Sequence, residues 1–128
     1  MLIKPFAALR PVPGRAAALA AVPYDVVDTA EARALAAGNP DSFLHVSRPE
    51  IDLPDSVDIH DDRVYAQGVA AFKDLQARGV LLREPDERLY VYRQIMSGHS
   101  QSGVVACCHI EDYAKDIIRK HEKTRKYK

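Results

Sequence analysis

The stretch from Asp61 to Arg78 constrains the fold of this chain most, because its apolar residues recur with the period of an α-helix. These small and apolar residues form one stripe: Val64, Gly68, Ala71, Phe72 and Leu75. Two aspartates at the start suit the positive end of a helix dipole, and Gly79 is typical of the position after a helix end. We therefore expect an amphipathic helix over Asp61–Arg78.

A capping box marks the start of a second helix. Asp28 provides a side-chain acceptor, and Glu31 follows three residues later, which is the spacing of a reciprocal helix cap. Gly38 and the Asn-Pro pair after it are typical helix stops. We therefore expect a helix from Asp28 through Ala37.

Shorter apolar runs predict strands. Met1–Phe6 and Ser42–Val46 are typical of brief strands, whereas Ser47–His60, rich in Pro, Asp and Ser, predicts an exposed loop. Arg88–Met96, rich in Tyr and Val, and Gly103–Ile110 predict two strands of an antiparallel hairpin. The second of these is apolar or small on both faces, which favours a central strand.

We expect the polar residues Ser97–Ser102 to form the turn of this hairpin. Glu111 then opens a further helix with Tyr113, Ile117 and His121 on one face. Together the segments predict an α+β fold: a small mixed sheet with a C-terminal antiparallel hairpin, flanked by helices. The length of 128 residues suits one domain over 1–128.

Charge and composition exclude several functional classes. Lys+Arg and Asp+Glu are both 18, so the chain lacks the basic excess that favours nucleic acid as a partner. No apolar run reaches the roughly 18 residues of a membrane span. The two cysteines, Cys107 and Cys108, are adjacent, a spacing that favours neither a disulfide nor a zinc site. We expect a cytoplasmic protein with no metal site of its own.

Two segments in the first half carry candidate site residues. Tyr24 and Asp25 follow a proline, and a carboxylate held there can act as a base or contact a metal-bound phosphate. The alternative for Asp25 is a turn acceptor that leads to the helix cap. His45, Arg48 and Glu50 lie where a strand is expected to run into a loop; the fork of Arg48 suits phosphate or carboxylate, and the alternative for His45 is a solvent-exposed side chain.

Two segments in the second half add further candidates. Arg93 stands among apolar neighbours in the hairpin, beside Gln94; it needs an anionic partner or must reach the sheet edge. The segment Lys120–Arg125 places His121, Glu122 and Arg125 within one helical turn. Glu122 can orient Arg125 toward an anion with His121 as acid or base, or the cluster is a solvated helix end that suits the dipole.

Six segments in this order resemble the ParB-like domain-of-unknown-function 1015 family: Ile3–Pro11, Val22–Val27, Asn39–Val46, Arg48–Asp52, Tyr92–Gln94 and Ile118–Arg125. Members of that family are longer and carry an Asp-Gly-His-His-Arg motif downstream. That motif is similar to one in free-serine kinases of ParB/sulfiredoxin-like fold. The resemblance implies a partial ParB/sulfiredoxin-like domain and either a small-molecule kinase or another nucleotide-binding site, with ATP or ADP and magnesium as the expected cofactors.

The resemblance also implies the partners and the site. A nucleotide and a small hydroxyl-bearing metabolite are the expected ligands, with Asp25, His121 and Glu122 as catalytic candidates. The expected ligand-binding residues are Tyr24, His45, Arg48, Glu50, Arg93, Gln94 and Arg125. This chain contains no Asp-Gly-His-His-Arg, so we expect the N-terminal part of a longer protein, inactive alone. The alternatives are a partition-type nucleotide- or DNA-binding module, and a structural domain that docks on a further segment or on a second copy.

Overall fold

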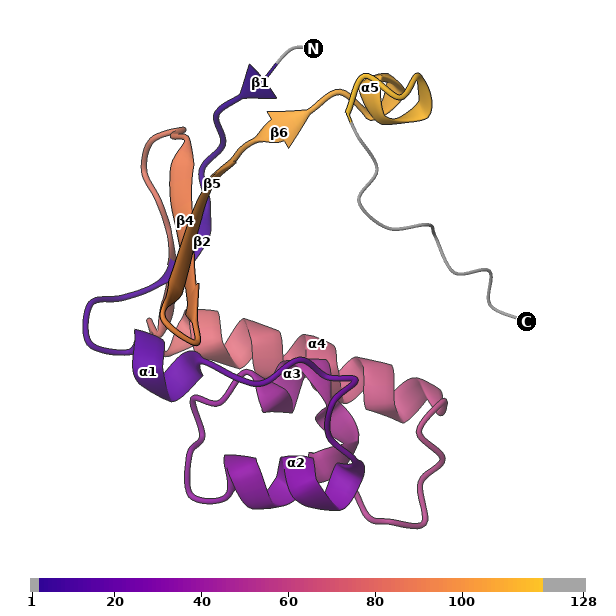
Figure 1. Ribbon diagram of the computed structural model, residues 1–128. Helices are drawn as coiled ribbons and strands as arrows, with labels where there is room; N and C mark the ends of the chain where they lie inside the picture. Colours follow the sequence, from indigo (N-terminus) through magenta and orange to yellow (C-terminus); the bar gives the residue numbers. More distant parts are fainter. Residues whose placement is uncertain (1–2, 119–128) are drawn as a thin grey trace. The chain divides into compact units, whose positions relative to one another are not determined.

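A computed structural model describes residues 3–118, which fall into two compact units. Residues 9–83 form the helical unit, and residues 3–8 with 84–118 form the hairpin unit. Figure 1 shows the elements of both. The expectation of a single domain over 1–128 stays a prediction.

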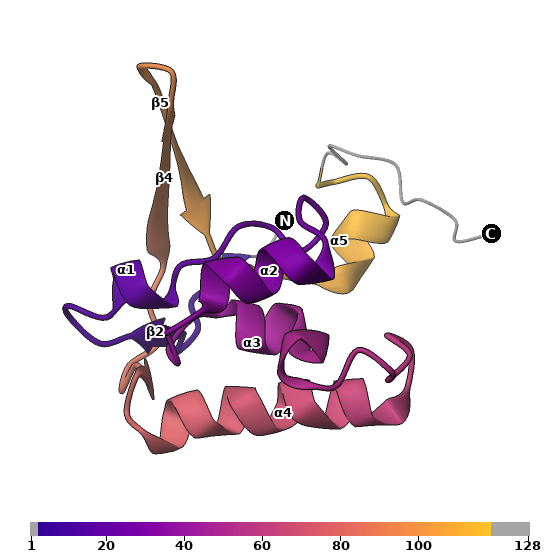
Figure 2. The same ribbon diagram turned by 90° about the horizontal axis from the view of Figure 1, so that it is seen from below.

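The helical unit is built mainly of helices, with one short strand at each end of its sequence. Its elements are β2 (Leu9–Pro11), α1 (Ala16–Leu19), α2 (Thr29–Ala36), α3 (Leu44–Ser47), the 3₁₀ helix η1 (Pro49–Asp52), α4 (Asp62–Ala77) and β3 (Leu81–Arg83). Figure 2 shows α3 between α2 and α4. One buried cluster joins Ala32 and Ala36 of α2 to Leu44 and Ile51, and a second joins Leu75, Val80 and Leu81.

The helix α4 confirms the first prediction, with both ends where the sequence indicates. The side chain of Asp61 accepts a hydrogen bond from the backbone N of Arg63 at 2.9 Å, and Gly79 has the positive φ of 68° that ends the helix. Val64, Gly68 and Leu75 of the predicted stripe are buried. The stripe therefore forms the contact of α4 with the rest of the helical unit.

The helix α2 confirms the capping box. Asp28 Oδ1 accepts from the backbone N of Glu31 at 2.8 Å, and Glu31 Oε2 accepts from the backbone N of Asp28 at 2.9 Å. Two otherwise unpaired backbone donors at the helix start are satisfied in this way.

Two expectations for residues 42–60 are wrong. Ser42–Val46 is not a strand, because Leu44–Ser47 forms a helical turn whose start is held by Ser42 Oγ, which accepts from the backbone N of Leu44 at 3.3 Å. The supposed exposed loop contains η1, and its Ile51 is buried. A short run such as Ser42–Val46, with apolar residues at Phe43, Leu44 and Val46, does not by itself distinguish a buried helical turn from a strand.

The hairpin unit contains β1 (Ile3–Lys4), β4 (Tyr90–Met96), β5 (His99–Val105), β6 (Cys107–Cys108) and α5 (Ile110–Ala114). β4 and β5 pair antiparallel, as predicted, but the turn is only two residues long, Ser97-Gly98, with φ values of 50° and 78°. Two left-handed residues are the geometry of a tight hairpin turn. His99–Ser102 therefore belong to β5 and not to the predicted loop.

The predicted strand Gly103–Ile110 is divided. β5 ends at Val105 and pairs with β4, whereas Cys107 and Cys108 pair with Lys4 and Ile3 of β1. Within residues 3–118, β5 has no second neighbour, so it is not the central strand expected. Both cysteines are exposed rather than buried in a core.

The last helix is shorter than predicted. α5 ends at Ala114, and Asp116 has a positive φ of 56°, so a continuous helix through Tyr113 and Ile117 is wrong. The α+β class is confirmed, with three small antiparallel sheets, β1–β6, β2–β3 and β4–β5, in place of one mixed sheet. Over residues 3–118, every helix is too short or too polar to cross a membrane.

Candidate functional site

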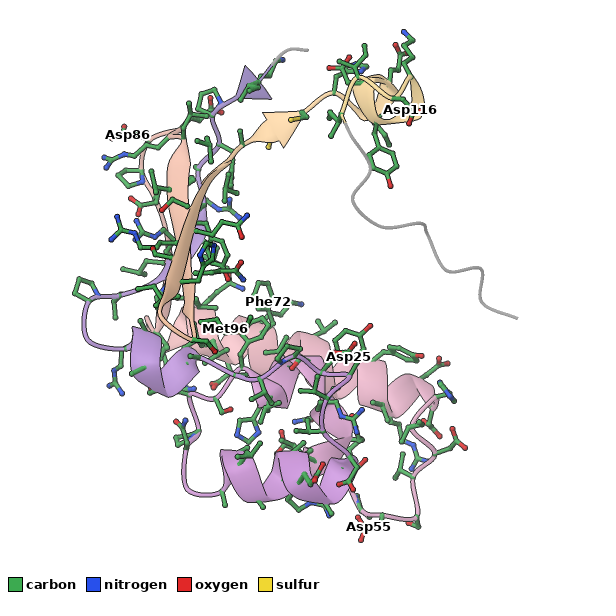
Figure 3. All side chains as sticks on the ribbon, in the orientation of Figure 1. Asp25, Asp55, Phe72, Asp86, Met96 and Asp116 are labelled. Atoms are coloured by element: carbon green, nitrogen blue, oxygen red, sulfur yellow. The ribbon has the colours of Figure 1, made fainter. Side chains whose placement is uncertain are left out.

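A cavity of about 590 Å³ lies in the helical unit between α4 and the segment of α3 and η1. We call it the Tyr24 pocket, after the residue that the α1–α2 connection contributes to it. Its walls are mostly apolar: Tyr24, Val46, Ser47, Arg48, Pro49, Glu50, Ile59, Val64, Tyr65, Gly68, Val69 and Phe72. Figure 3 labels Phe72 on α4 and Asp25 on the connection that leads to α2.

Gly68 sets how closely α4 approaches η1 beneath this pocket. A Cβ at Gly68 would lie 3.2 Å from both Pro49 Cγ and the carbonyl oxygen of Val46. A side chain there would push the two walls apart, since 3.2 Å is closer than ordinary carbon contact distances.

Arg48 and Glu50 form the charged corner of the pocket, supported by Thr29 from α2. Arg48 Nε lies 2.9 Å from Glu50 Oε1, and Arg48 Nη2 donates to Thr29 Oγ1 at 3.3 Å. Thr29 Oγ1 in turn donates to Glu50 Oε1 at 3.5 Å. The two charges are therefore mutually neutralised and oriented by a hydroxyl.

The charged corner is well shielded from water, with the side chains of Arg48 and Glu50 only 21% and 10% exposed. Although Arg48 Nε is close to the carboxylate, its N–H does not point at the oxygen, and this buried atom has no hydrogen-bond partner among the residues that the structure describes. A buried donor left without an acceptor costs about 1–3 kcal/mol. The corner therefore favours a ligand that brings an acceptor.

Aromatic side chains form the opposite walls. Tyr24 and Tyr65 are more than half exposed, at 58% and 59%, while Phe72 meets Phe43 edge to face with ring centroids 6.5 Å apart. Tyr24 and Tyr65 therefore keep much of their surface free for contact with a planar group.

A second apolar cavity of about 470 Å³ shares Tyr24 and Ser47 with the Tyr24 pocket. Leu19, Val22 and Phe43 contribute to its walls. Tyr24 therefore separates two neighbouring hollows of the helical unit.

His45 lies outside the Tyr24 pocket and borders a separate cavity of about 290 Å³. Its Nδ1 is 2.8 Å from Asp52 Oδ2, and its Nε2 is 3.1 Å from the carbonyl oxygen of Asn39. Both partners offer oxygen atoms, and the tautomer of the ring decides which nitrogen donates. Through these contacts His45 ties η1 to the loop that follows α2, and its ligand-binding role stays a prediction.

The other candidates are spread over the chain. Asp25 is exposed in a turn closed by the hydrogen bond from the backbone N of Val26 to the carbonyl oxygen of Pro23, at 3.2 Å. Arg93 and Gln94 are exposed on β4 of the hairpin unit. His121, Glu122 and Arg125 lie outside the described residues. The structure therefore brings together Tyr24, Arg48 and Glu50 of the predicted set.

Sequence reasoning did not name most of the pocket lining as site residues. Among those missed are Tyr65, Val69 and Phe72 of α4, as well as Thr29, which supports the charged corner. Tyr65, Val69 and Phe72 recur at i, i+4 and i+7 on α4, beside the buried stripe, and this second stripe was a readable signal. From the sequence, Thr29 could be predicted only as the start of a helix, since its contact with Arg48 depends on how α2 packs on η1.

Asp41 is a buried ionic centre that the sequence did not indicate. It pairs with Arg15 at 2.8 Å and with Arg78 at the end of α4. The hydrogen bond from Arg78 holds the pKa of Asp41 below its ordinary value, aided by the charge of Arg15. Asp41 thus joins α1, the α2–α3 connection and α4, a structural role.

Metal binding has little support in the described part of the chain. Over residues 3–118, no three His, Cys, Asp or Glu side chains gather in a way that can hold an ion. The carboxylate of Glu50 is engaged by Arg48 and Thr29.

No curated protein and no solved structure matches the chain. One protein family, described as a protein of unknown function (DUF1015), matches it over residues 3–128. The match spans both the helical and the hairpin unit, and it agrees with the ordered segments read from the sequence. The chain belongs to the DUF1015 family.

Proposed function

We propose that this chain is the N-terminal part of a ParB-like, nucleotide-dependent small-molecule kinase, and that its Tyr24 pocket binds ligand. Such a kinase moves the terminal phosphoryl group of ATP or ADP to a hydroxyl of a metabolite, leaving ADP or AMP and a released proton. The observation that carries the proposal is the Tyr24 pocket itself: an apolar, aromatic cavity with one charged corner. Such cavities are the usual form of organic ligand sites.

The pocket supports binding rather than the chemical step. Phosphoryl transfer needs several cations around the phosphates and a positioned base. Among the described residues, Arg48 is the only cation that lines the Tyr24 pocket, and Glu50 neutralises it. The resemblance makes Asp25, His121 and Glu122 the catalytic candidates beside the downstream motif. Asp25 does not line the Tyr24 pocket and the other two lie outside the described residues, so we expect the transfer to need residues beyond this pocket.

The two expected cofactors, a nucleotide and a magnesium ion, differ in how well they fit the Tyr24 pocket. The aromatic walls and the donor at Arg48 suit a nucleotide, because bases stack on aromatic side chains. A magnesium ion does not fit the described residues, since Glu50 is already paired and they give the pocket no second carboxylate. We assign no step to the metal.

A thermal-shift titration tests the proposal. ATP and ADP, each with and without magnesium, are added to the chain, and the midpoint of unfolding is recorded. At ten times Kd a ligand stabilises by about 1.4 kcal/mol, which corresponds to a rise of several degrees. Absence of any rise with either nucleotide up to millimolar concentration would overturn the proposal.

The matched variants are Arg48→Lys and Arg63→Lys. Arg48→Lys keeps a charge beside Glu50 but removes Nε, so we expect a smaller rise with nucleotide. Arg63 is exposed, pairs with Asp61 and does not line the Tyr24 pocket, so its variant should respond as the unchanged chain does.

A further inference from the structure

We infer that the Tyr24 pocket holds the base and sugar of a purine nucleotide, with the phosphates outside it. This inference rests on the proposed function and deepens it, because it says which part of which ligand the pocket takes. It also implies that the small hydroxyl-bearing metabolite binds elsewhere than in the Tyr24 pocket.

The volume of the pocket favours the larger ligand. Organic ligands of drug size occupy cavities of roughly 300–1,000 Å³. At about 590 Å³, the Tyr24 pocket accommodates a nucleoside, whereas a metabolite of a few heavy atoms would leave most of the apolar wall in water. Burial of apolar surface is the main favourable term available here.

The charges exclude the phosphates from the charged corner. Glu50 lies 2.9 Å from Arg48 and is 10% exposed, so an incoming phosphate would face a shielded carboxylate beside the guanidinium. Like charges brought together in a poorly solvated site repel strongly. Within residues 3–118, no other lysine or arginine lines the Tyr24 pocket to offset this repulsion. A neutral group therefore fits the corner better than an anion.

The hydrogen-bonding groups of the corner match the edge of a purine. Arg48 Nε offers a buried N–H for which the described residues provide no acceptor, and Glu50 offers carboxylate oxygens beside it. A ring edge with an acceptor next to an amino or N–H donor can satisfy both at once. Purine bases carry such edges, and phosphates carry no comparable donor.

The aromatic walls supply the remaining interaction. Tyr24 and Tyr65 line the pocket and are each more than half exposed, so a flat ring can stack on them without displacing a tightly packed side chain. Stacking of a base on an aromatic side chain contributes about 1–3 kcal/mol. Tyr24 and Tyr65 would therefore bind the base and not the phosphates.

The test compares adenosine, guanosine, their di- and triphosphates and inorganic tripolyphosphate by isothermal titration calorimetry on the whole chain. We expect one of the two purine nucleosides to bind within about tenfold of its nucleotide, a difference of about 1.4 kcal/mol. Tripolyphosphate should not compete with it. Nucleoside affinity should also change little between low and high salt, since no charge enters the pocket.

Tyr24→Ala and Tyr92→Ala form the matched pair of variants, with the two tyrosines 58% and 57% exposed. We expect Tyr24→Ala to lower nucleoside and nucleotide affinity alike, by about tenfold or more if 1–3 kcal/mol of stacking is lost. Tyr92, on β4 of the hairpin unit, should be silent.

The outcomes separate the inference from the proposed function. Binding of ATP or ADP without binding of either nucleoside, or displacement by tripolyphosphate, overturns the inference and leaves the proposed function standing. Binding of none of the nucleosides and nucleotides overturns both.

Discussion

The helical and hairpin units are stabilised in different ways. The buried hydrophobic residues of the described chain all lie in the helical unit, between Ala32 and Leu81. In the hairpin unit, by contrast, Val91, Met96 and Ile110 are among the most exposed apolar residues. The helical unit therefore depends on side-chain packing, and the hairpin unit depends on backbone pairing.

The hairpin unit has a side-chain anchor of its own. Tyr90 stacks on Phe6 with ring centroids 5.1 Å apart, and its hydroxyl donates to the carbonyl oxygen of Phe6 and accepts from the backbone N of Ala8. A two-stranded hairpin is marginal without such support. A pocket with fixed walls is therefore expected in the helical unit, which is where the Tyr24 pocket lies.

The largest expected difference between the two units is the effect of truncating an apolar side chain. Leu75 is 2% exposed and Val91 is 76% exposed. Leu75→Ala should cost about 2–5 kcal/mol of unfolding free energy, because it removes buried methyl groups and leaves a cavity. Val91→Ala should change it by less than about 0.5 kcal/mol. Urea unfolding of both variants measures the difference, and equal effects would refute the contrast in packing.

A glycine-to-alanine substitution in each unit compares how tightly the two units are packed, beginning with Gly68 at the Tyr24 pocket. Gly68→Ala places Cβ 3.2 Å from Pro49 Cγ and from the carbonyl oxygen of Val46. We expect a net loss of about 1 kcal/mol, since overpacking of about 1–3 kcal/mol exceeds the gain in helix propensity. Nucleotide affinity should fall with it, as the pocket floor shifts.

Gly103→Ala is the control in the hairpin unit. A Cβ at Gly103, on β5, meets no described atom within 4 Å. Chemical denaturation should show no loss and a gain of up to about 1 kcal/mol, because alanine restricts the unfolded chain more than glycine does. A loss at Gly103 equal to that at Gly68 would show that packing does not distinguish the units.

A smaller effect is expected at the cap of α2. Asp28→Ala removes the side-chain acceptor for the backbone N of Glu31 but keeps the backbone N that donates to the Glu31 carboxylate, and it should cost about 1 kcal/mol. Asp86→Ala, at an exposed aspartate of the hairpin unit paired with Arg88 at 3.2 Å, should cost less than about 0.5 kcal/mol. Thermal unfolding ranks the two, and the reverse order would contradict the assignment of the cap.

The features predictable from sequence are those set by neighbouring residues. The helix α4 follows from periodicity and Gly79, and α2 follows from Asp28 and Glu31, because caps and stripes act within one or two turns. The hairpin follows from alternation in β4. The register of the hairpin could not be predicted in the same way. The polar residues Ser97–Ser102 suggest one long loop, although the left-handed pair Ser97-Gly98 alone makes the turn.

The features that the sequence did not predict depend on residues far apart in the chain. β2 pairs with β3 across more than sixty residues, as in Leu9 with Arg83. Within the site, Arg48 and Glu50 could be identified from the sequence because they are near neighbours in it, whereas Tyr24 was indicated by the resemblance. Thr29 reaches Arg48 only through packing of α2 on η1.

The smallest effect we expect is a pH dependence at the start of α4. The backbone and side-chain hydrogen bonds of Arg63 lower the pKa of Asp61 from 3.8 to about 2, with the side-chain bond the larger cause. A lowered pKa in the folded state contributes stability that is complete above the unfolded pKa, near 4, and is lost as pH falls toward 2. The unfolding midpoint should therefore fall over this window.

Asp61→Asn isolates that contribution, because asparagine keeps the N-cap acceptor but does not titrate in this range. The variant should have a lower midpoint near neutral pH and a shallower fall between about pH 4 and 2, where Asp41, whose pKa is also lowered, still titrates. Glu111→Gln removes an ion pair of the hairpin unit whose Lys115 and Glu111 side chains are both well exposed, so its profile should follow the unchanged chain. Identical profiles for Asp61→Asn and the unchanged chain would mean that the Arg63 contact does not persist in solution, and that α4 begins without this ion pair.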